Sequence, residues 1–169
     1  AVVIVATIRA LKMHGGLAKT ELGAENLEAL EKGLPNLLRH VSNIRDVYKL
    51  PSVVAVNRFP TDTDAEVALI IEKCKELGVN VVLSNVWAEG GKGGVELEEE
   101  VVRLCEMPND FSFSYDTDNT IAGKIETIVK RIYGGAGITI EAAAKKQIDT
   151  LTALGFDKLP ICMAKTQYS

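Results

Sequence analysis

Short runs of apolar residues alternate along the chain with longer segments in which apolar residues recur every three or four positions. Four runs are apolar at almost every position, which is typical of strands that are buried on both faces of a parallel sheet. These runs span residues 2–8, 53–56, 81–84 and 160–164. A fifth run, residues 111–115, alternates aromatic side chains with serine and predicts an edge strand. The pattern indicates the α/β fold class, with a mostly parallel sheet and helices on both faces.

Three segments outside these strands predict helices that pack against the sheet. The clearest helix begins after Thr63, because Thr63 and Glu66 match the T-x-x-E capping box, and it ends near Gly78. Residues 25–47 predict two consecutive helices, because Pro35 fits the first turn of a helix better than its interior. The apolar faces of the three sheet-packing helices are Val67, Ile70, Ile71, Cys74 and Leu77; Leu97, Val101, Leu104 and Cys105; and Ile121, Ile125, Ile128, Val129 and Ile132.

The composition is that of an ordinary globular segment. The 169 residues are 47% hydrophobic and 25% charged, without a repeat or linker, so we expect one α/β segment over residues 1–169. A net charge of −4 without a basic stripe argues against a nucleic-acid partner. The apolar runs are too short to cross a bilayer and no signal-peptide pattern opens the chain, so we expect a cytoplasmic protein without membrane contact.

The three cysteines, Cys74, Cys105 and Cys162, form no C-x-x-C pair and lie near no histidine cluster. Their spacing predicts neither a disulfide framework nor a zinc site, and we expect no metal ligands in the chain. Reduced, buried thiols are the simplest interpretation. The two histidines, His14 and His40, complete no serine triad or cysteine–histidine pair.

Unusual residues follow the ends of three predicted strands. Because the carboxyl ends of parallel strands meet at one edge of a sheet, we expect these residues to share a cleft. The first group is residues 9–16, RALKMHGG, which predicts a loop. In that loop the cations Arg9 and Lys12, the imidazole of His14 and the paired glycines Gly15 and Gly16 would surround an anionic group, whereas a plain polar turn is the alternative.

Aromatic residues follow the other two strand ends. Phe59 stands beside Pro60 in the sequence Asn-Arg-Phe-Pro, and Trp87 is the only tryptophan. Together the two rings predict a clamp for a flat heterocycle, with ordinary core packing as the alternative for Phe59. The glycine-rich stretch after Trp87 contains Lys92 but is not a Walker A loop, because Gly93 stands where that motif needs serine or threonine.

Residues 5–16, VATIRALKMHGG, resemble one of the two signature segments of the formate–tetrahydrofolate ligase family. Further stretches are similar to the bacterial single-function branch of that family. They are NLEALEKGLPNLLRH, VVAVNRFPTDTDAE, CKELGVNVVLSNVWAEGGKGG, KIETIVKRIYG and LGFDKLPICMAKTQYS. The resemblance therefore runs the whole length of the chain.

The resemblance implies an ATP-dependent ligase that joins formate to N10 of tetrahydrofolate through formyl phosphate, giving 10-formyltetrahydrofolate, ADP and phosphate. It implies small-molecule substrates only, with Mg²⁺ accompanying ATP and a monovalent cation stimulating the enzyme. It also implies a homotetramer of much longer subunits, with P-loop NTPase-like or Rossmann-like layers. By matching position, it assigns folate binding to Asn57, Phe59, Pro60 and Trp87, nucleotide binding to Leu83, Ser84, Gly15 and Gly16, and candidate catalytic roles to Lys12 and His14.

The family's phosphate-binding loop is not found in residues 1–169. We therefore expect an internal segment of a longer subunit, and we expect the segment alone to be inactive, because stabilising charge on the transferring phosphoryl group is the main work of such catalysis. Two alternatives remain at this point. One is a non-catalytic nucleotide- or pterin-binding α/β module, and the other is a segment that chiefly builds subunit contacts.

Overall fold

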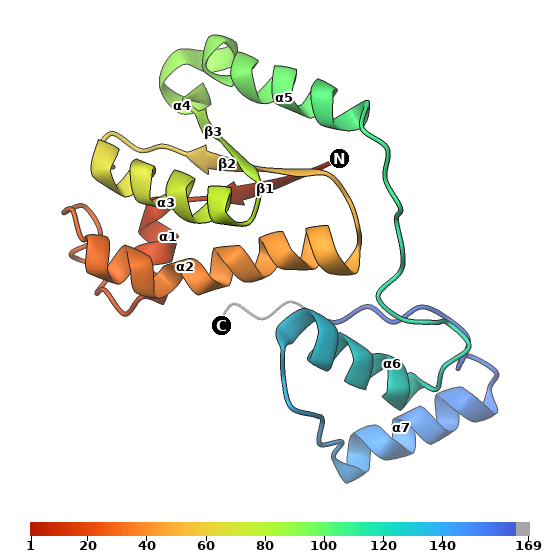
Figure 1. Cartoon of the computed structure of the whole chain (residues 1–169). Coiled ribbons are helices and arrows are strands. Elements are labelled where there is room, and N and C mark those ends of the chain that lie inside the picture. The colour runs from red at the N-terminus through yellow and green to blue at the C-terminus, as the bar shows by residue number, and fades with distance from the viewer. Residues whose placement is uncertain (165–169) are drawn as a thin grey trace. The chain divides into compact units, whose positions relative to one another are not determined.

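The computed structural model describes residues 1–164. The chain divides into two compact units, Ala1–Phe111 and Ser112–Ser169. The first unit holds a three-stranded sheet with its helices, and the second holds two helices in its described part (Figure 1). The grouping of residues 1–169 as one α/β segment stays a prediction.

The sheet of the first unit is parallel, with the order β1-β2-β3. Its strands are β1 (Val2–Ala6), β2 (Ser52–Asn57) and β3 (Asn80–Ser84). The central strand β2 is buried along residues 52–56, as its uninterrupted apolar pattern predicts. Three of the predicted strands and the α/β class are thus confirmed. The prediction that all three are buried on both faces is wrong for β1, where Val5 is 67% exposed, and for β3, which is only partly buried.

Helices cover both faces of this sheet (Figure 1). One face carries α1 (Ile8–His14), α2 (Leu27–Ser42) and α3 (Asp64–Glu76), and the other carries α5 (Val95–Cys105), which follows the short α4 (Val86–Glu89). The main core lies between the sheet and the first three helices. Its buried members are Ala6, Ile8, Leu11, Leu30, Leu34, Leu37, Val41, Val54, Val56, Val67, Ile70, Cys74 and Val79.

The capping box at the start of α3 is confirmed. The backbone N–H of Glu66 donates to Thr63 Oγ1, and the backbone N–H of Thr63 donates to Glu66 Oε2. The helix ends near Gly78, whose φ of 71° is the left-handed conformation that glycine adopts readily.

Among the cysteines, only Cys74 is buried as predicted; Cys105 and Cys162 are exposed. Burial raises the pKa of the Cys74 thiol to about 11.

Two predictions near the N-terminus are wrong. Residues 9–16 are mostly helix rather than loop, because β1 stops at Ala6 and Thr7 caps α1 by accepting a hydrogen bond from the N–H of Ala10. Residues 25–47 do not form two helices: α2 runs through Pro35 and continues into a π-helical turn, Asn43–Val47. Pro35 is exposed while buried leucines precede and follow it, so packing maintains the helix despite the missing N–H.

The second unit contains α6 (Ile121–Ile128), a π-helical turn (Val129–Tyr133) and α7 (Ala142–Ala153). The strands predicted at residues 111–115 and 160–164 are wrong, since both segments are irregular. Their contacts come from side chains: Tyr115 Oη accepts from the N–H of Ile161 at 2.7 Å and donates to its carbonyl at 3.1 Å. The prediction of a sheet-packing helix holds for α3 and α5, whereas α6 packs against α7.

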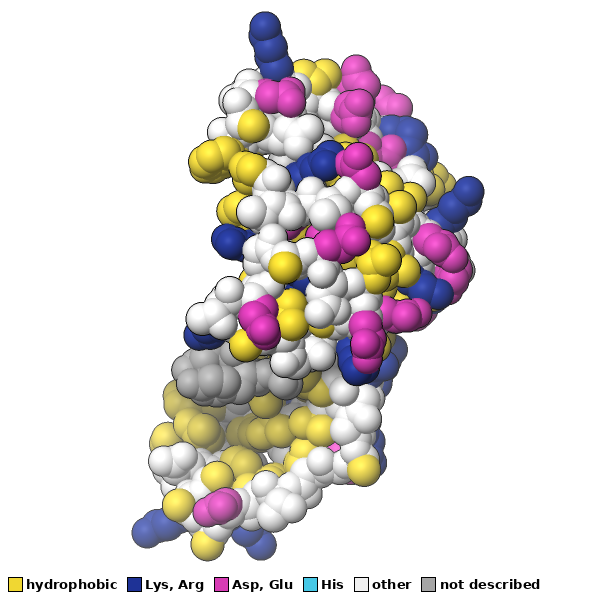
Figure 2. Space-filling view, turned by 90° about the vertical axis from the view of Figure 1, so that its left-hand side faces the viewer, with side chains coloured by type: hydrophobic (Ala, Val, Ile, Leu, Met, Phe, Trp, Pro, Cys, Tyr) yellow, Lys and Arg dark blue, Asp and Glu magenta, His cyan; other side chains and the backbone are white. Residues whose placement is uncertain are grey.

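Charged side chains of both signs are interspersed on the face drawn in Figure 2, with apolar side chains between them. Within residues 1–164, no helix is both long and apolar enough to cross a membrane.

Candidate functional site

Residues that follow β2 and β3 line one pocket at the carboxyl edge of the sheet. Phe59 and Pro60 come directly after β2, and Trp87 lies in α4, directly after β3. The structure therefore brings together three of the predicted site residues. We call this cavity of about 370 Å³ the aromatic pocket; its lining is Arg58, Phe59, Pro60, Asn85, Trp87, Ala88 and Glu89.

A tight turn fixes the backbone of Phe59. The N–H of Asp62 donates to the Phe59 carbonyl at 2.9 Å, and the N–H of Phe59 donates to Asp62 Oδ2 at 2.8 Å. Pro60 occupies the second position of this turn, where its fixed φ is favourable. Asp62 is buried, and its Oδ1 has no hydrogen-bond partner within residues 1–164. Sequence reasoning missed Asp62, although Phe-Pro-Thr-Asp carries the composition of such a turn.

A cationic group lies over the Phe59 ring, and a second one is held beside it in the sequence. The guanidinium of Arg9, in the first turn of α1, lies over the Phe59 ring at 5.5 Å from its centroid. Such a cation–π contact at an exposed site stabilises by about 0.5–1 kcal/mol. Arg58 is held differently, because its Nη2 is 2.6 Å from Asp64 Oδ1. One face of the Phe59 ring is thus covered by a cation from the signature segment, residues 5–16.

Trp87 is held on a short helix that the glycine-rich stretch supports. The N–H of Asn85 donates to the Gly93 carbonyl at 3.0 Å. A Cβ on Gly93 would lie 2.5 Å from the Asn85 carbonyl, so this close approach requires glycine. The Trp87 side chain itself is 74% exposed. Glycine therefore positions the turn that carries Trp87, and its ring is left open to a ligand.

The predicted residues at the ends of β2 and β3 are register partners. Asn57 pairs with Ser84, and Leu83 precedes Ser84 on β3. Asn57 and Ser84 each stand one position before a pocket-lining residue, Arg58 and Asn85 respectively. Neither is part of the pocket lining, although both are partly buried at the same edge of the sheet.

Lys12 lies in the interior rather than in a loop. Its side chain is fully buried, and Nζ donates to Glu66 Oε1 and to the carbonyl of Ala24, both at 2.8 Å. Glu66 also accepts from the backbone N–H groups of Asn26 and Thr63. Burial raises the pKa of Glu66, but hydrogen bonds from Lys12, Asn26 and Thr63 and the attraction of Lys12 outweigh burial and lower it overall. The pair joins α1, the start of α2 and the start of α3.

The predicted glycines at the end of α1 have a packing role. A Cβ on Gly15 would lie 1.8 Å from the carbonyl oxygen of Ala29 in α2, so the helices approach too closely for any other residue. Gly16 has a left-handed φ of 94°. His14 forms a side-chain hydrogen bond through Nδ1 with the Asn36 amide of α2. Close packing between α1 and α2 thus explains Gly15 and the contact of His14 without a bound anion.

A family model described as formate–tetrahydrofolate ligase matches residues 1–169. The match includes the helix α1 with its Arg9, the turn at Phe59 and the glycine-supported Trp87, and it confirms the resemblance found in the sequence. The chain belongs to the formate–tetrahydrofolate ligase family.

Proposed function

We propose that the aromatic pocket binds the pterin ring of tetrahydrofolate in an ATP-dependent ligase. The enzyme would join formate to N10 of the folate through formyl phosphate and release 10-formyltetrahydrofolate, ADP and phosphate. One observation carries the proposal: Phe59 and Trp87, which follow different strands, line the same pocket at the carboxyl edge of a parallel sheet. That edge is where ligands of open α/β sheets bind.

The geometry supports stacking of a flat ring. Arg9 lies over one face of the Phe59 ring, and Phe59 lines the pocket, so we assign stacking of the pterin to the opposite face. Trp87 supplies a second, exposed ring in the same pocket. Offset aromatic pairs gain about 0.5–1.5 kcal/mol beyond the burial of area. The role of the clamp is to orient the folate so that N10 is presented to the formyl group.

Asp62 is proposed as a positioning residue for this clamp. Its Oδ2 accepts a hydrogen bond from the backbone N–H of Phe59, which fixes the turn from which the Phe59 ring projects. Its Oδ1 is a buried acceptor without a partner among the described residues. An unsatisfied buried carboxylate oxygen is costly, which favours a donor from a bound ligand.

We propose that the nucleotide lies beside the folate, near Leu83, Ser84, Gly15 and Gly16. This assignment rests on the family resemblance and on the position of Leu83 and Ser84 at the carboxyl end of β3. His14 is still proposed as a candidate catalytic residue, since it is exposed at the end of α1. For Lys12, the buried pair with Glu66 favours a structural role over proton transfer.

Other family properties are part of the same proposal. The parent subunit would be a cytoplasmic homotetramer that uses ATP with Mg²⁺ and is stimulated by a monovalent cation. Within residues 1–164 no group of three or more His, Cys, Asp or Glu side chains is placed to hold a metal ion.

We further propose that the 169-residue chain alone does not catalyse the ligation of formate to tetrahydrofolate. Residues 1–169 contain no Walker A pattern to hold the phosphates of ATP. A coupled assay of the purified chain with ATP, formate and tetrahydrofolate should give no product above the enzyme-free rate. Turnover that depends on all three substrates would contradict this part of the proposal.

Equilibrium dialysis with two ligands tests the folate site directly. Tetrahydrofolate should bind, whereas p-aminobenzoylglutamate, which lacks the pterin, should bind far more weakly. Phe59→Ala should weaken tetrahydrofolate binding by roughly ten- to a hundred-fold, because it removes one stacking surface. Phe156→Ala, which removes an exposed ring of the second unit, is the matched control. Equal binding of the two ligands would show that the pterin is not what the chain recognises.

A further inference from the structure

The strand β3 is at an edge of the sheet, and its outer side has no strand partner within residues 1–164. The carbonyl of Ser84 accepts from the N–H of Arg58, so the backbone groups of Ser84 face β2. Because backbone groups alternate along a strand, those of Val81 and Leu83 face outward. Two residues therefore present unpaired donors and acceptors along this edge.

Nothing on β3 protects this edge. Val81, Val82 and Leu83 are apolar, and the strand contains no proline and no charged residue. Natural proteins usually shield edge strands with charge, proline, bulges or a covering element, because an open apolar edge pairs with other chains. The edge of β3 is therefore suited to accept another strand.

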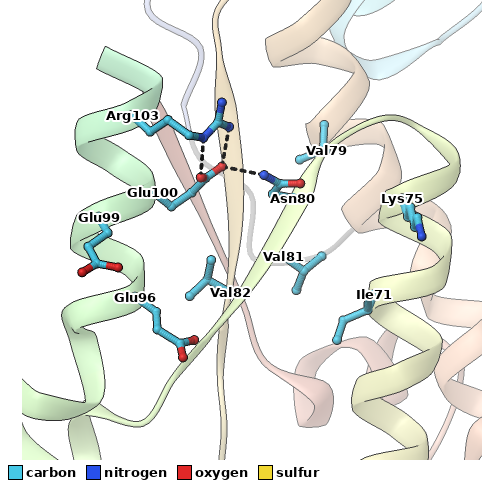
Figure 3. Close-up of a pocket in the computed structure, with 10 residues that line it drawn as sticks. All are labelled: Ile71, Lys75, Val79, Asn80, Val81, Val82, Glu96, Glu99, Glu100 and Arg103. Carbon is cyan, nitrogen blue, oxygen red and sulfur yellow. Dashed lines mark hydrogen bonds and ion pairs between the residues drawn. The ribbon is translucent and has the colours of Figure 1, made fainter. Parts of the chain in front are cut away.

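Helices flank this edge and form a groove of about 510 Å³, which we call the β3 groove (Figure 3). One wall is α3, with Ile71 and Lys75, and the other wall is α5. Val81 points toward Ile71, and Val82 points toward α5 (Figure 3). A strand in this groove would thus place alternate side chains against Ile71 of α3 and against α5.

The α5 wall is acidic. The carboxylate of Glu100 already accepts hydrogen bonds from Arg103 and from the Asn80 amide. Glu96 and Glu99 also line the groove and have no ion-pair partner within the described part of the chain. Glu96 extends from α5 toward β3 (Figure 3). This wall is complementary to basic side chains.

We propose that the β3 groove binds an extended peptide strand whose side chains alternate between apolar and basic. The backbone of the peptide would hydrogen-bond to Val81 and Leu83, its apolar side chains would pack on Ile71, and its basic side chains would face Glu96 and Glu99. A second copy of the chain fits less well, because antiparallel pairing of two β3 edges would bring the acidic wall of one α5 toward that of the other. The inference does not depend on the proposed folate site.

Three synthetic peptides test the inference by fluorescence anisotropy with the full chain. The first is acetyl-Val-Lys-Val-Lys-Val-Lys-Val-amide, the second replaces each lysine with glutamate, and the third is the lysine peptide with every backbone amide N-methylated. The lysine peptide should bind roughly ten-fold or more tightly than the glutamate peptide. The N-methylated peptide should not bind, because it cannot donate hydrogen bonds to β3.

Two further measurements locate the binding. Amide hydrogen exchange at Val81 and Leu83 should slow when the lysine peptide is bound, since a new strand would pair with both residues. The double variant Glu96→Lys/Glu99→Lys should prefer the glutamate peptide, whereas Glu98→Lys, on the same helix but outside the groove lining, should keep the original preference.

Three results would overturn the inference. One is that neither charged peptide binds. Another is that the lysine peptide binds without slowing exchange at Val81 and Leu83. The third is concentration-dependent dimerisation in light scattering that slows exchange at the same two residues, because a second copy would then occupy the β3 groove.

Discussion

At the residue scale, the buried pair of Lys12 and Glu66 connects segments that are 54 residues apart in the sequence. Both side chains are fully buried, and together they satisfy the carbonyl of Ala24 and two backbone N–H groups at helix starts. A buried ion pair is not stabilising merely because it is present, since desolvation offsets the attraction. Breaking it, however, leaves one uncompensated charge in the core. The pair therefore maintains the arrangement of α1, α2 and α3.

Replacing Lys12 tests this role. Lys12→Met should lower the free energy of unfolding by about 3–5 kcal/mol, because Glu66 is left buried without its cation. Urea denaturation measures the change. Lys32→Met is the control, since the ion pair of Lys32 with Glu28 is exposed, and its effect should stay within about 0.5 kcal/mol. If Lys12→Met keeps wild-type stability, the structural role is wrong and a catalytic role for Lys12 gains support.

The pH dependence of stability tests the same pair from the Glu66 side. The folded-state pKa of Glu66 lies below its ordinary value of 4.5, so its stabilising contribution is present above that pH and is lost as the pH falls through the folded-state value. The difference in unfolding free energy between wild type and Glu66→Gln should therefore be constant near neutral pH and shrink in acid. Glu98→Gln reports the effect of removing a solvated carboxylate. A difference that grows on acidification would contradict the assignment.

At the element scale, close contact between α1 and α2 depends on two glycines. A Cβ on Gly33 of α2 would lie 1.8 Å from the Leu11 carbonyl oxygen, just as one on Gly15 would meet Ala29. Glycine inside a helix lowers helix stability by about 1 kcal/mol relative to alanine. Its presence at position 33 therefore indicates that close packing of α1 and α2 outweighs the low helix propensity of glycine.

Replacing glycine with alanine stabilises an exposed position inside a helix, whereas Gly33→Ala should lower the free energy of unfolding. The substitution should destabilise the chain by about 1–3 kcal/mol in urea denaturation, because the helices must separate to admit the methyl group. Gly23→Ala is the matched control, since nothing lies within 4 Å of its added Cβ. A stabilised Gly33→Ala variant would show that α1 and α2 do not approach as closely as described.

The sequence predicted the elements whose signals are local. The strands β1 to β3 follow from uninterrupted apolar runs, and the start of α3 follows from its capping box. Helix α1 was missed because Gly15 and Gly16 suggested a turn, although Thr7 followed by Ile8 and Leu11 carried the signal of a capped helix.

Other predictions were wrong because the structure of those segments depends on residues distant in the sequence. The alternation at residues 111–115 has the period of a strand, but a strand also needs a partner. In the structure that segment is fixed instead by contacts such as the one from Arg131 Nη1 to the Ser114 carbonyl. For the candidate site, the two aromatic residues were predicted from their place after strands. The burial of Lys12 depends on its tertiary contact with Glu66 and was not predicted. The contact of Asp62 with the Phe59 N–H is local, and its signal, the turn composition of Phe-Pro-Thr-Asp, was missed.

At the scale of the whole molecule, the first unit gathers the residues that the family resemblance marks. Arg9 comes from the start of α1, Phe59 follows β2, and Trp87 follows β3, so one edge of the sheet collects side chains from three distant parts of the sequence. The β3 groove is lined by a different set of residues, from α3, β3 and α5. Loss of peptide binding there and loss of folate binding are therefore separable by mutation.

The most direct test of the central claim is a titration of the intrinsic fluorescence of Trp87 with tetrahydrofolate, corrected for inner-filter absorption. Trp87 is the only tryptophan, so the signal has a single source. Saturable quenching that weakens in Phe59→Ala and persists in Phe156→Ala is the predicted result, and it would place the pterin between the two rings. Quenching that does not saturate, or that is the same in Phe59→Ala as in the wild type, would contradict the aromatic clamp.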